Sequence, residues 1–346
     1  MPLKRGDYFL NEPKFCNCIV TGGAGFIGSH LVERLLADGH KVTVIDNLVS
    51  GSRDNLAREK DNPRLTMVEA DVCDQAKIEP FFENVNVVFH LAAMADIVPS
   101  IQNPVAYHHA NVNGTVTILE CVRNANCERF IYTGSSSCYG LPDVKPTPEH
   151  APARPMYPYA LTKWVGEQYA MHWAQTYQCS VISLRLFNVF GPRHRTGGTY
   201  GAMFGVFLAQ KLANKPFTIV GDGTQTRDFT FVSDVVDAFV TAAKSDITGK
   251  IMNVGSGGTY SVNRIAELLG GETINIPKRP GEPDCTFADI TQIEELLGWR
   301  PKVSLEEGVQ VLLDQIDDWR DAPVWEPPSI KEATADWFKY LGNKNA

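Results

Sequence analysis

A glycine-rich turn between a strand and a helix constrains this chain more than any other feature. The segment CIVTGGAGFIGSHLVERLL, residues 18–36, runs from an apolar strand through a turn into an amphipathic helix and places Gly22, Gly25 and Gly28 in the turn. Glycines there allow a tight turn, close approach of the backbone to a pyrophosphate, and close packing of helix on strand. The helix N-terminus offers free N–H groups to phosphates. The segment therefore predicts a dinucleotide site.

Asp46 indicates which dinucleotide is preferred. It follows Gly28 by 18 residues and ends the second apolar run, where a carboxylate can accept hydrogen bonds from ribose hydroxyls. A 2′-phosphate would meet like charge there, and neither Asn47 nor Leu48 is basic, so NAD is favoured over NADP. The alternative is that Asp46 only begins a turn. Asp71 follows the third strand and is either an adenine contact or a solvated loop acid.

The first half of the chain alternates strand-like runs with helical stretches. Val, Ile and Phe dominate the apolar runs, as expected for strands buried on both faces. These runs are 16–21, 42–46, 85–91, 129–133 and 181–186. Helical periodicity lies between them, as in 26–38. This alternation predicts an α/β fold of the Rossmann type, with a doubly wound parallel sheet built from right-handed βαβ units.

The pattern of apolar and loop residues changes after about residue 188. Loops containing Gly and Pro separate shorter elements there, which predicts a smaller C-terminal α/β lobe over the strand ends. Ligands of open α/β sheets bind at that edge, so the site is expected between sheet and lobe. We expect four parts: an N-terminal extension 1–15, an NAD-binding Rossmann domain 16–188, a substrate-binding lobe 189–321 with some elements returning to the sheet, and a packed C-terminal tail 322–346.

Composition disfavours several classes of function. The net charge of −8 argues against a broad nucleic-acid surface. No segment has the uninterrupted apolar length of a membrane span, and the start of the chain lacks the apolar run of a signal peptide, so we expect a cytoplasmic protein away from membranes. The eight cysteines fit no CxxC pair and no zinc signature. They are expected to be core thiols in a reducing compartment, with no bound metal.

Tyr159 and Lys163 are the strongest candidates for acid/base chemistry. They lie four residues apart in a helical stretch and so share a face. The pKa of a free tyrosine is about 10, and a nearby ammonium favours the phenolate. An ordinary surface pair is the alternative, since this spacing is common on amphipathic helices. Tyr157 is the rival base, but residue 161 is Leu, so Tyr157 lacks a lysine partner.

A serine run precedes this pair. GSSSCYG follows the fifth strand and places Ser135, Ser136 and Ser137 at the carboxyl end of that strand. A hydroxyl there can bridge the tyrosine to a reacting oxygen of the substrate. The alternative for such a run is a turn.

Together these motifs give the chain a specific resemblance over nearly all of residues 16–320. It resembles the extended short-chain dehydrogenase/reductase family, in particular its NAD-dependent nucleotide-sugar epimerases and dehydratases of the UDP-glucose 4-epimerase type. The matching segments are TGGAGFIG, Asp46, Asp71-Val72, HLAA at 90–93, NVNGT at 111–115, SSSCYG, Tyr159 with Lys163, RLFNVFGPR at 185–193, GDGTQTRDFTFVSDV at 221–235 and RPGEPD at 279–284.

The resemblance implies a role for each matching residue. Ser135 matches the catalytic Ser/Thr beside Tyr159 and Lys163. The implied cofactor site comprises these last two residues and Gly22, Gly25, Phe26, Ile27, Gly28, Asp46, Asn47, Asp71, Val72, Leu91, Ala92, Ala93, Asn111, Phe187 and Val189, of which Asn111, Phe187 and Val189 match residues near the nicotinamide.

The substrate implied by the resemblance is a nucleotide-diphosphate sugar. Asn188, Arg227 and Arg279 match a clamp on its diphosphate, and Glu282 matches a residue near the nucleotide ribose. Arginine forks suit a dianionic diphosphate in a cleft. The remaining implied contacts are Ser136, Ser137 and Arg195.

Departures from the family pattern narrow the reaction. Members that dehydrate the sugar carry Asp-Glu directly after the catalytic Ser/Thr, and decarboxylating members carry a Glu two residues after it. Ser136 and Ser137 occupy these places, which favours 4-epimerisation through a transient 4-keto intermediate. Arg195 could contact a uronate carboxylate or be a loop charge, and Thr286 leaves room for an N-acetyl or carboxylate group. The substrate is therefore expected to be a UDP-hexose, N-acetylhexosamine or uronate, UDP being the family's commonest nucleotide.

Other functions remain open at this point. One is a 4-oxidoreductase or dehydratase of the same family, with net redox or elimination. Another is a catalytically silent NAD-binding scaffold, against which the intact Ser135, Tyr159 and Lys163 argue. Helical stretches 105–126 and 157–178 carry apolar residues on more than one face. In the resembling family these two helices form a four-helix bundle, so a homodimer is expected.

Overall fold

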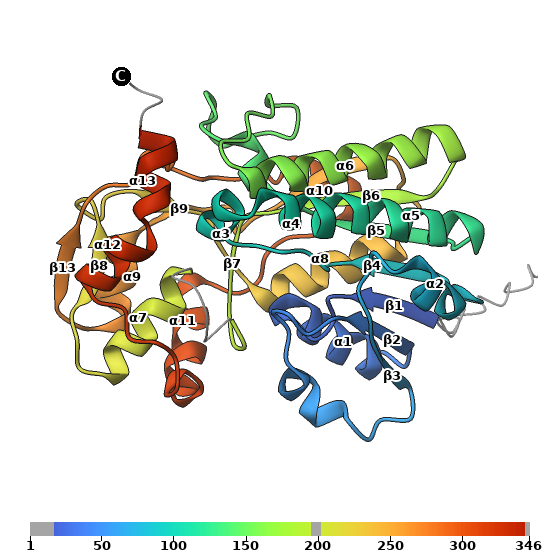
Figure 1. Ribbon diagram of the computed structural model, residues 1–346, viewed down its shortest axis with the longest axis horizontal. Coiled ribbons are helices and arrows are strands. Elements are labelled where there is room, and N and C mark those ends of the chain that lie inside the picture. Colours follow the sequence, from blue (N-terminus) through green and yellow to red (C-terminus); the bar gives the residue numbers. More distant parts are fainter. Residues whose placement is uncertain (1–16, 195–201, 343–346) are drawn as a thin grey trace, which may run out of the picture.

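The computed structural model describes residues 17–194 and 202–342, and a parallel sheet forms its centre (Figure 1). Seven strands pair in the order β11-β6-β5-β4-β1-β2-β3, and every pairing is parallel. In chain order these strands are β1 Asn17–Thr21, β2 Lys41–Asp46, β3 Leu65–Glu69, β4 Val87–His90, β5 Arg129–Ser135, β6 Val181–Leu186 and β11 Lys250–Val254. This is the α/β fold of the Rossmann type that the alternating pattern predicts.

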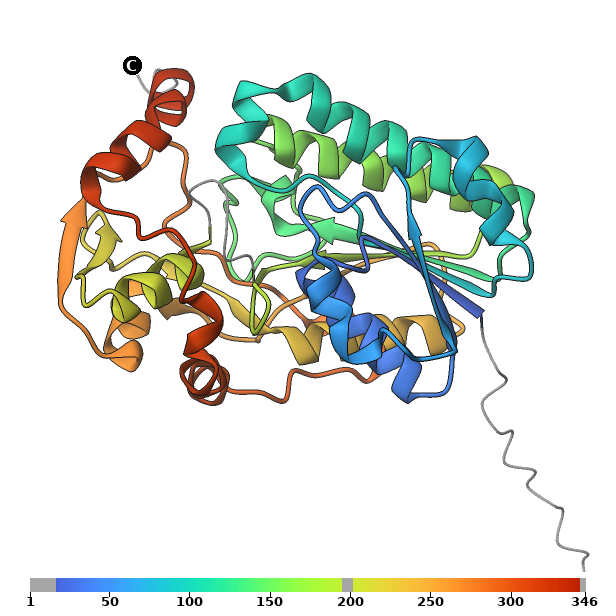
Figure 2. The same ribbon diagram turned by 60° about the horizontal axis from the view of Figure 1, so that its bottom comes forward.

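Helices cover both faces of this sheet (Figure 2). On one face lie α1 Phe26–Ala37 and α8 Val232–Lys244, with α10 Thr291–Leu297 beside β11. On the other lie α5 Gly114–Asn124 and α6 Pro158–Tyr177. Strand residues alternate between these two cores: Val20 packs toward α1 and α8, and its neighbour Ile19 packs toward α5 and α6. Such alternation is the period-two geometry of a strand buried on both faces.

Shorter elements connect the strands and the main helices. They are α2 Gln75–Ile78, α3 Ile97–Gln102 and α4 Pro104–His108, with 3₁₀ turns at Arg53–Glu59, Glu79–Phe82 and Ser136–Tyr139. The predicted helix 105–126 forms as one continuous helical stretch, in which a π-helical turn, His109–Asn113, lies between α4 and α5. Within this turn the Asn111 side chain is held by Met94 and Thr162. These are tertiary contacts, which helical periodicity does not encode.

The second lobe has its own hydrophobic core. It contains α7 Met203–Leu212, α9 Val262–Leu269 and α11 Leu305–Asp314, together with paired strands β8 Phe217–Val220 and β13 Thr273–Ile276. Two short strand pairs lie where the second lobe meets the cleft. In one, β7 Asn188–Phe190 pairs with β10 Phe229–Phe231, and in the other β9 Thr226–Arg227 pairs with β12 Tyr260–Ser261. After α11, the chain continues in a 3₁₀ turn, Ile316–Trp319.

The described part of the C-terminal tail, up to residue 342, contains two short packed helices. It forms α12 Pro327–Ala333 and α13 Ala335–Leu341, and α13 lies against α3. Within the described ranges, no helix has both the length and the apolar character that crossing a membrane would need.

Candidate active site

The glycine turn has the geometry that a pyrophosphate requires. Gly22 adopts a left-handed backbone (φ 69°), and a Cβ atom built on it would lie 2.7 Å from the Ala92 backbone nitrogen. A Cβ on Gly28 would collide with the Gly22 carbonyl oxygen. Gly25 is the N-cap of α1 and provides no side-chain cap. The first amides of α1 therefore have no side-chain partner from the cap, and this arrangement fits the phosphates of a dinucleotide.

Acidic residues follow β2 and β3 on the same edge of the sheet. The buried Asp46 carboxylate accepts hydrogen bonds from Leu48 N (2.8 Å) and Ala24 N (3.0 Å), and burial raises its pKa. Asp71 accepts hydrogen bonds from Cys73 N (2.8 Å) and the Asn47 amide (3.1 Å). Burial opposes ionisation of Asp71, but these hydrogen bonds outweigh it and its pKa is lowered. A carboxylate has about four acceptor positions, so Asp46 retains capacity for ribose hydroxyls.

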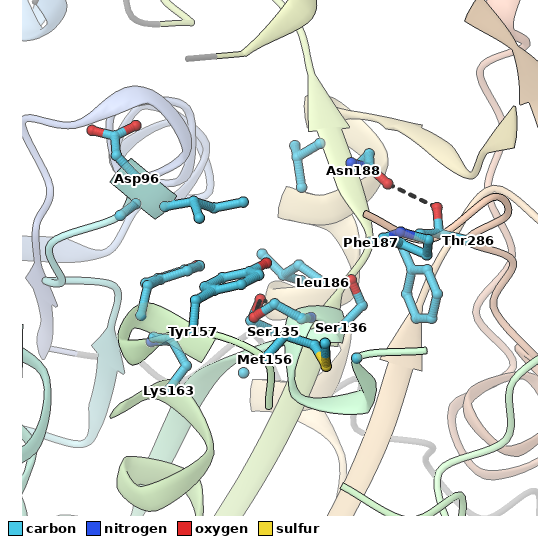
Figure 3. Close-up of a pocket in the computed structure, with 18 of the residues that line it drawn as sticks. Asp96, Ser135, Ser136, Met156, Tyr157, Lys163, Leu186, Phe187, Asn188 and Thr286 are labelled. Carbon is cyan, nitrogen blue, oxygen red and sulfur yellow. Dashed lines mark hydrogen bonds between the residues drawn. The ribbon is translucent and has the colours of Figure 1, made fainter. Parts of the chain in front are cut away.

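A cavity of about 420 Å³ lies between the sheet and the second lobe (Figure 3). Residues from three strand ends line it: Leu91 and Ala93 after β4, Ser135 at the end of β5, and Leu186 at the end of β6. The other predicted site residues that line the cavity are Ile27, Ser136, Ser137, Tyr159, Lys163, Phe187, Asn188, Val189, Arg227 and Glu282. Hydroxyl, lysine and arginine groups distant in sequence thus share one cavity.

Tyr159 is partly buried at the wall of this cavity. Burial raises the pKa of its phenol, and a hydrogen bond with the Ser135 side chain works in the opposite direction. The Lys163 ammonium lies over the ring of Tyr132, with Nζ 4.6 Å from the centroid. Lys163 is only 4% exposed, and burial lowers its pKa to about 8, against the effect of Glu167.

These positions describe the predicted acid/base pair in the protein without NAD. The spacing of Tyr159 and Lys163 suggests that the ammonium lowers the pKa of the phenol. In the structure the pKa of Tyr159 is raised, and Lys163 is not among the groups that shift it. The reason is that the ammonium rests over Tyr132, while the phenol is desolvated by its surroundings.

A chain of hydroxyl groups connects the two tyrosines. Ser135 Oγ and Ser137 Oγ are 2.8 Å apart. Ser135 interacts with Tyr159, and Ser137 forms a side-chain hydrogen bond with Tyr157. The two tyrosine rings are stacked at 6.4 Å with an interplanar angle of 11°. Burial raises the pKa of Tyr157 strongly, so it is a poorer base than a phenol in water.

The charged end of the cavity is built around Glu282. Arg227 is 8% exposed and donates a hydrogen bond to Glu282 at 3.0 Å. Arg279 Nη1 lies 4.0 Å from the other Glu282 oxygen. Nearby, Thr286 donates a hydrogen bond to the Asn188 side chain at 3.0 Å (Figure 3). Two guanidinium groups therefore converge on one carboxylate at the place where the resemblance implies a diphosphate.

Several predicted residues are placed elsewhere. Asn111 is not a lining residue of the cavity: it is 1% exposed, and its amide bonds to the Met94 backbone and the Thr162 hydroxyl. Val72 is buried and packs beside Gly114. Arg279 is not a lining residue either. Arg195 lies outside the described residues, as do 196–201.

The cavity also contains residues that motif reasoning missed. Asp96, Met156, Gly281 and Trp337 line it. Asp96 carries a strained backbone for a non-glycine residue (φ 135°, ψ 133°) at the rim opposite Asn188 and Thr286 (Figure 3). Gly281 lies within the RPGEPD motif but was given no role, whereas no motif marks the other three, and Trp337 comes from the tail, more than 170 positions after Tyr159.

Comparisons with known proteins agree with this geometry. The model of the NAD dependent epimerase/dehydratase family matches residues 18–255. A UDP-glucose 4-epimerase of Mycolicibacterium smegmatis is 38% identical over 304 residues, covering 84% of this chain and 95% of that protein. UDP-glucuronic acid decarboxylase 2 of Arabidopsis thaliana is 36% identical over 307 residues, covering 85% of this chain and 67% of that protein.

A solved structure has the same fold. It is a UDP-N-acetylglucosamine 4-epimerase of Methanobrevibacter ruminantium in complex with UDP-N-acetylmuramic acid. The two chains superpose with a TM-score of 0.82 at 33% identity, and the match covers 88% of this chain and 100% of the other.

Proposed function

Because the chain belongs to the NAD-dependent epimerase/dehydratase family, we propose that it is an enzyme that inverts C4 of a UDP-linked sugar. The observation that carries this proposal is the shared cavity of Ser135, Tyr159 and Lys163, next to the convergent Arg227 and Glu282. The end of the cavity with Ser135 and Tyr159 suits a reacting sugar hydroxyl, and the end with Arg227 suits a diphosphate. The relatives include both epimerases and decarboxylases, so the reaction depends on what stands beside Ser135.

Tyr159 acts as the base at the sugar 4-hydroxyl in this proposal. Its Oη takes the proton of that hydroxyl, with Ser135 Oγ bridging the two oxygens, and gives the proton back when the sugar hydroxyl re-forms. The glycine turn and Asp46 would hold NAD, which would supply a reversible hydride acceptor for C4 of the sugar and a positive charge that favours the phenolate. Because both transfers are reversed within one cycle, no net oxidation results.

Lys163 supports the tyrosine by its charge. Its ammonium is buried between helix α6 and Tyr132, where a positive charge is poorly screened. Movement of the ammonium from the Tyr132 ring toward Tyr159 would favour the phenolate. We assign Lys163 to lowering the pKa of the tyrosine in the loaded enzyme.

The substrate diphosphate is held by arginine side chains in this proposal. Arg227 and Arg279 would exchange their shared partner Glu282 for phosphate oxygens, since a guanidinium fork matches phosphate as well as carboxylate. Asn188, positioned by Thr286, is the third member of the clamp. Arg195 stays a proposed contact for a sugar carboxylate.

Ser136 and Ser137 favour epimerisation over the other reactions of the family. Neither side chain is a carboxylic acid, whereas elimination and decarboxylation depend on an acid next to the catalytic hydroxyl. Ser137 is bonded within the hydroxyl chain, so it supports the tyrosine pair instead. We therefore expect the reaction to invert C4 of the sugar, without elimination or decarboxylation.

A panel of UDP-sugars tests this function. Purified protein with NAD is incubated with UDP-glucose, UDP-N-acetylglucosamine and UDP-glucuronate, and products and absorbance at 340 nm are followed together. We expect one substrate to equilibrate with its C4 epimer without lasting absorbance. Accumulation of NADH with a 4-keto sugar, and no epimer from any substrate, would instead identify a net oxidoreductase.

The assembly and location belong to the same proposal. We propose a homodimer that pairs α4–α5 and α6 with the same helices of a second copy. Exposed apolar side chains on α4 and α6 support it: Val105, Leu161, Tyr169 and Tyr177. We also propose a cytoplasmic location, supported by free thiols at all seven cysteines that the described part of the chain contains.

A further inference from the structure

The C-terminal tail passes from the second lobe to the Rossmann-type domain. At its start, Gln210 of α7 donates a hydrogen bond to the Trp325 carbonyl at 2.7 Å, which fixes the tail to the lobe. At its end, α13 packs on α3 across the cleft, and Gln102 donates a hydrogen bond to Asp336 at 2.9 Å. One short segment thus connects both sides of the cavity.

Trp337 is the residue of α13 that reaches the cavity. Its side chain is 6% exposed and forms a small apolar cluster with Val98 and Leu341, against which Ile97 and Tyr157 pack. Its indole N–H donates a hydrogen bond to the Pro280 carbonyl at 2.8 Å, on the lobe side. Trp337 also lines the cavity, as do Ile97 and Tyr157. A single side chain therefore forms a wall of the cavity and touches both sides of the cleft.

The same indole ring supports Arg279. The guanidinium carbon lies 5.3 Å from the Trp337 ring centroid, a distance at which a cation is attracted to the face of an aromatic ring. Arg279 adjoins Pro280, whose carbonyl binds the indole N–H, so the ring and the arginine are held by adjacent residues. The position of this guanidinium relative to Glu282 thus depends on a side chain of the tail.

We propose that Trp337 is a specificity-determining residue of the substrate pocket, which limits the space beside Tyr157 and positions Arg279 for the substrate diphosphate. This inference rests on the proposed function and adds a residue outside the segment 18–255 that the family model matches. Shortening the side chain removes a wall of the cavity and releases the guanidinium. Binding of the diphosphate should weaken, and sugars with larger substituents should gain relative to smaller ones.

The test uses the full chain with Trp337→Ala, and Phe338→Ala as the matched control, because Phe338 is the next residue on α13 and is 38% exposed. UDP affinity is measured by calorimetry, and kcat and KM are measured with UDP-glucose and UDP-N-acetylglucosamine. For Trp337→Ala we expect about 10-fold weaker UDP binding, a higher KM with kcat changed less than about twofold, and a higher ratio of kcat/KM for the N-acetyl sugar over glucose. Phe338→Ala should match the parent protein.

The inference is overturned if Trp337→Ala binds UDP as the control does and keeps the parent ratio for the two sugars. If thermal unfolding shows that Trp337→Ala does not fold, Trp337→Leu keeps apolar packing against Val98 and serves for the same measurements. If the parent protein turns over neither of these sugars nor UDP-glucuronate, the proposed function fails, but the UDP titration still decides whether Trp337 supports the diphosphate site.

Discussion

At the scale of single residues, Tyr157 and Tyr159 are close neighbours with different surroundings. Both side chains are partly buried, their rings are stacked, and each interacts with a serine of the same run. Only Tyr159 shares a helical face with Lys163. Its side chain interacts with Ser135, whereas that of Tyr157 interacts with Ser137. Tyr157 lies beyond Ser137 and packs against Trp337. Replacing each tyrosine by Phe in turn removes its hydroxyl group and therefore distinguishes the proposed base from its neighbour.

We predict that Tyr159→Phe lowers turnover by about 100-fold or more, because it removes the atom that exchanges the proton with the sugar. NAD content, measured after denaturation, should be retained. Tyr157→Phe is the matched control and should have a mild effect. A larger loss of turnover in Tyr157→Phe than in Tyr159→Phe would reverse the assignment of the base.

The buried lysine predicts a pH dependence of stability in protein freed of NAD. The pKa of Lys163 is about 8, below its ordinary value of 10.5. Between these values the unfolded chain binds one more proton at this residue than the folded chain, so the stability of the parent protein rises with pH there. Below pH 8 both states are protonated and the cost of the buried charge is present in full.

Lys163→Met, which removes the charge, isolates this contribution. Relative to the parent protein, its free energy of unfolding should be most favourable near pH 7, and the difference should shrink as the pH approaches 10. Urea denaturation of both proteins at several pH values measures it. A difference that does not change between pH 7 and pH 10 would show that the folded-state pKa of Lys163 is not lowered.

At the scale of elements, local patterns predicted structure where local contacts determine it. The turn from β1 into α1 follows from three glycines, and α6 begins at Pro158 and ends at Tyr177, close to the predicted 157–178. The π-helical turn between α4 and α5 was not predictable, because it coincides with contacts of Asn111 to residues 17 and 51 positions away. Short strand pairs such as β9 with β12 also form between distant segments.

Helix α6 is joined to the sheet by a buried ion pair. Arg185 on β6 and Glu167 on α6 are 2.6 Å apart and nearly inaccessible, and Glu167 also accepts a hydrogen bond from Ser183. Removing one partner leaves an uncompensated buried charge. Because α6 carries both Tyr159 and Lys163, this pair also fixes the helix on which the proposed base stands.

We predict that Glu167→Ala lowers the free energy of unfolding by about 3–5 kcal/mol, measured by denaturant titration. Asp317→Asn is the control, since its pair with Arg320 is exposed on both sides and should change stability little. If the two substitutions have equal effects, the buried pair does not hold α6 in the way its geometry indicates.

At the scale of the whole molecule, the two ends of the site were not equally predictable. Asp46, Ser135 and Lys163 follow recognisable strand ends or helical spacing, so the sequence indicated them. Trp337 reaches the cavity only because the tail folds back on α3, and nothing near it in the sequence indicates that contact. The charged cluster of Arg227, Arg279 and Glu282 likewise required matching motifs, since single surface arginines look alike in a sequence.

The last prediction concerns assembly. Val105 on α4 and Tyr169 on α6 are 77% and 39% exposed, on helices whose other faces cover the sheet. In a two-fold interface each substitution occurs twice, so Val105→Glu with Tyr169→Glu would place four charges in an apolar contact. We expect the parent protein to have twice the 38.2 kDa mass of the chain by light scattering at micromolar concentration, and the double variant to have the mass of one chain. Val144→Glu, at an exposed loop position outside these helices, should remain dimeric. A parent protein with the mass of one chain would contradict the proposed homodimer directly, and a double variant that stays dimeric would place the interface elsewhere.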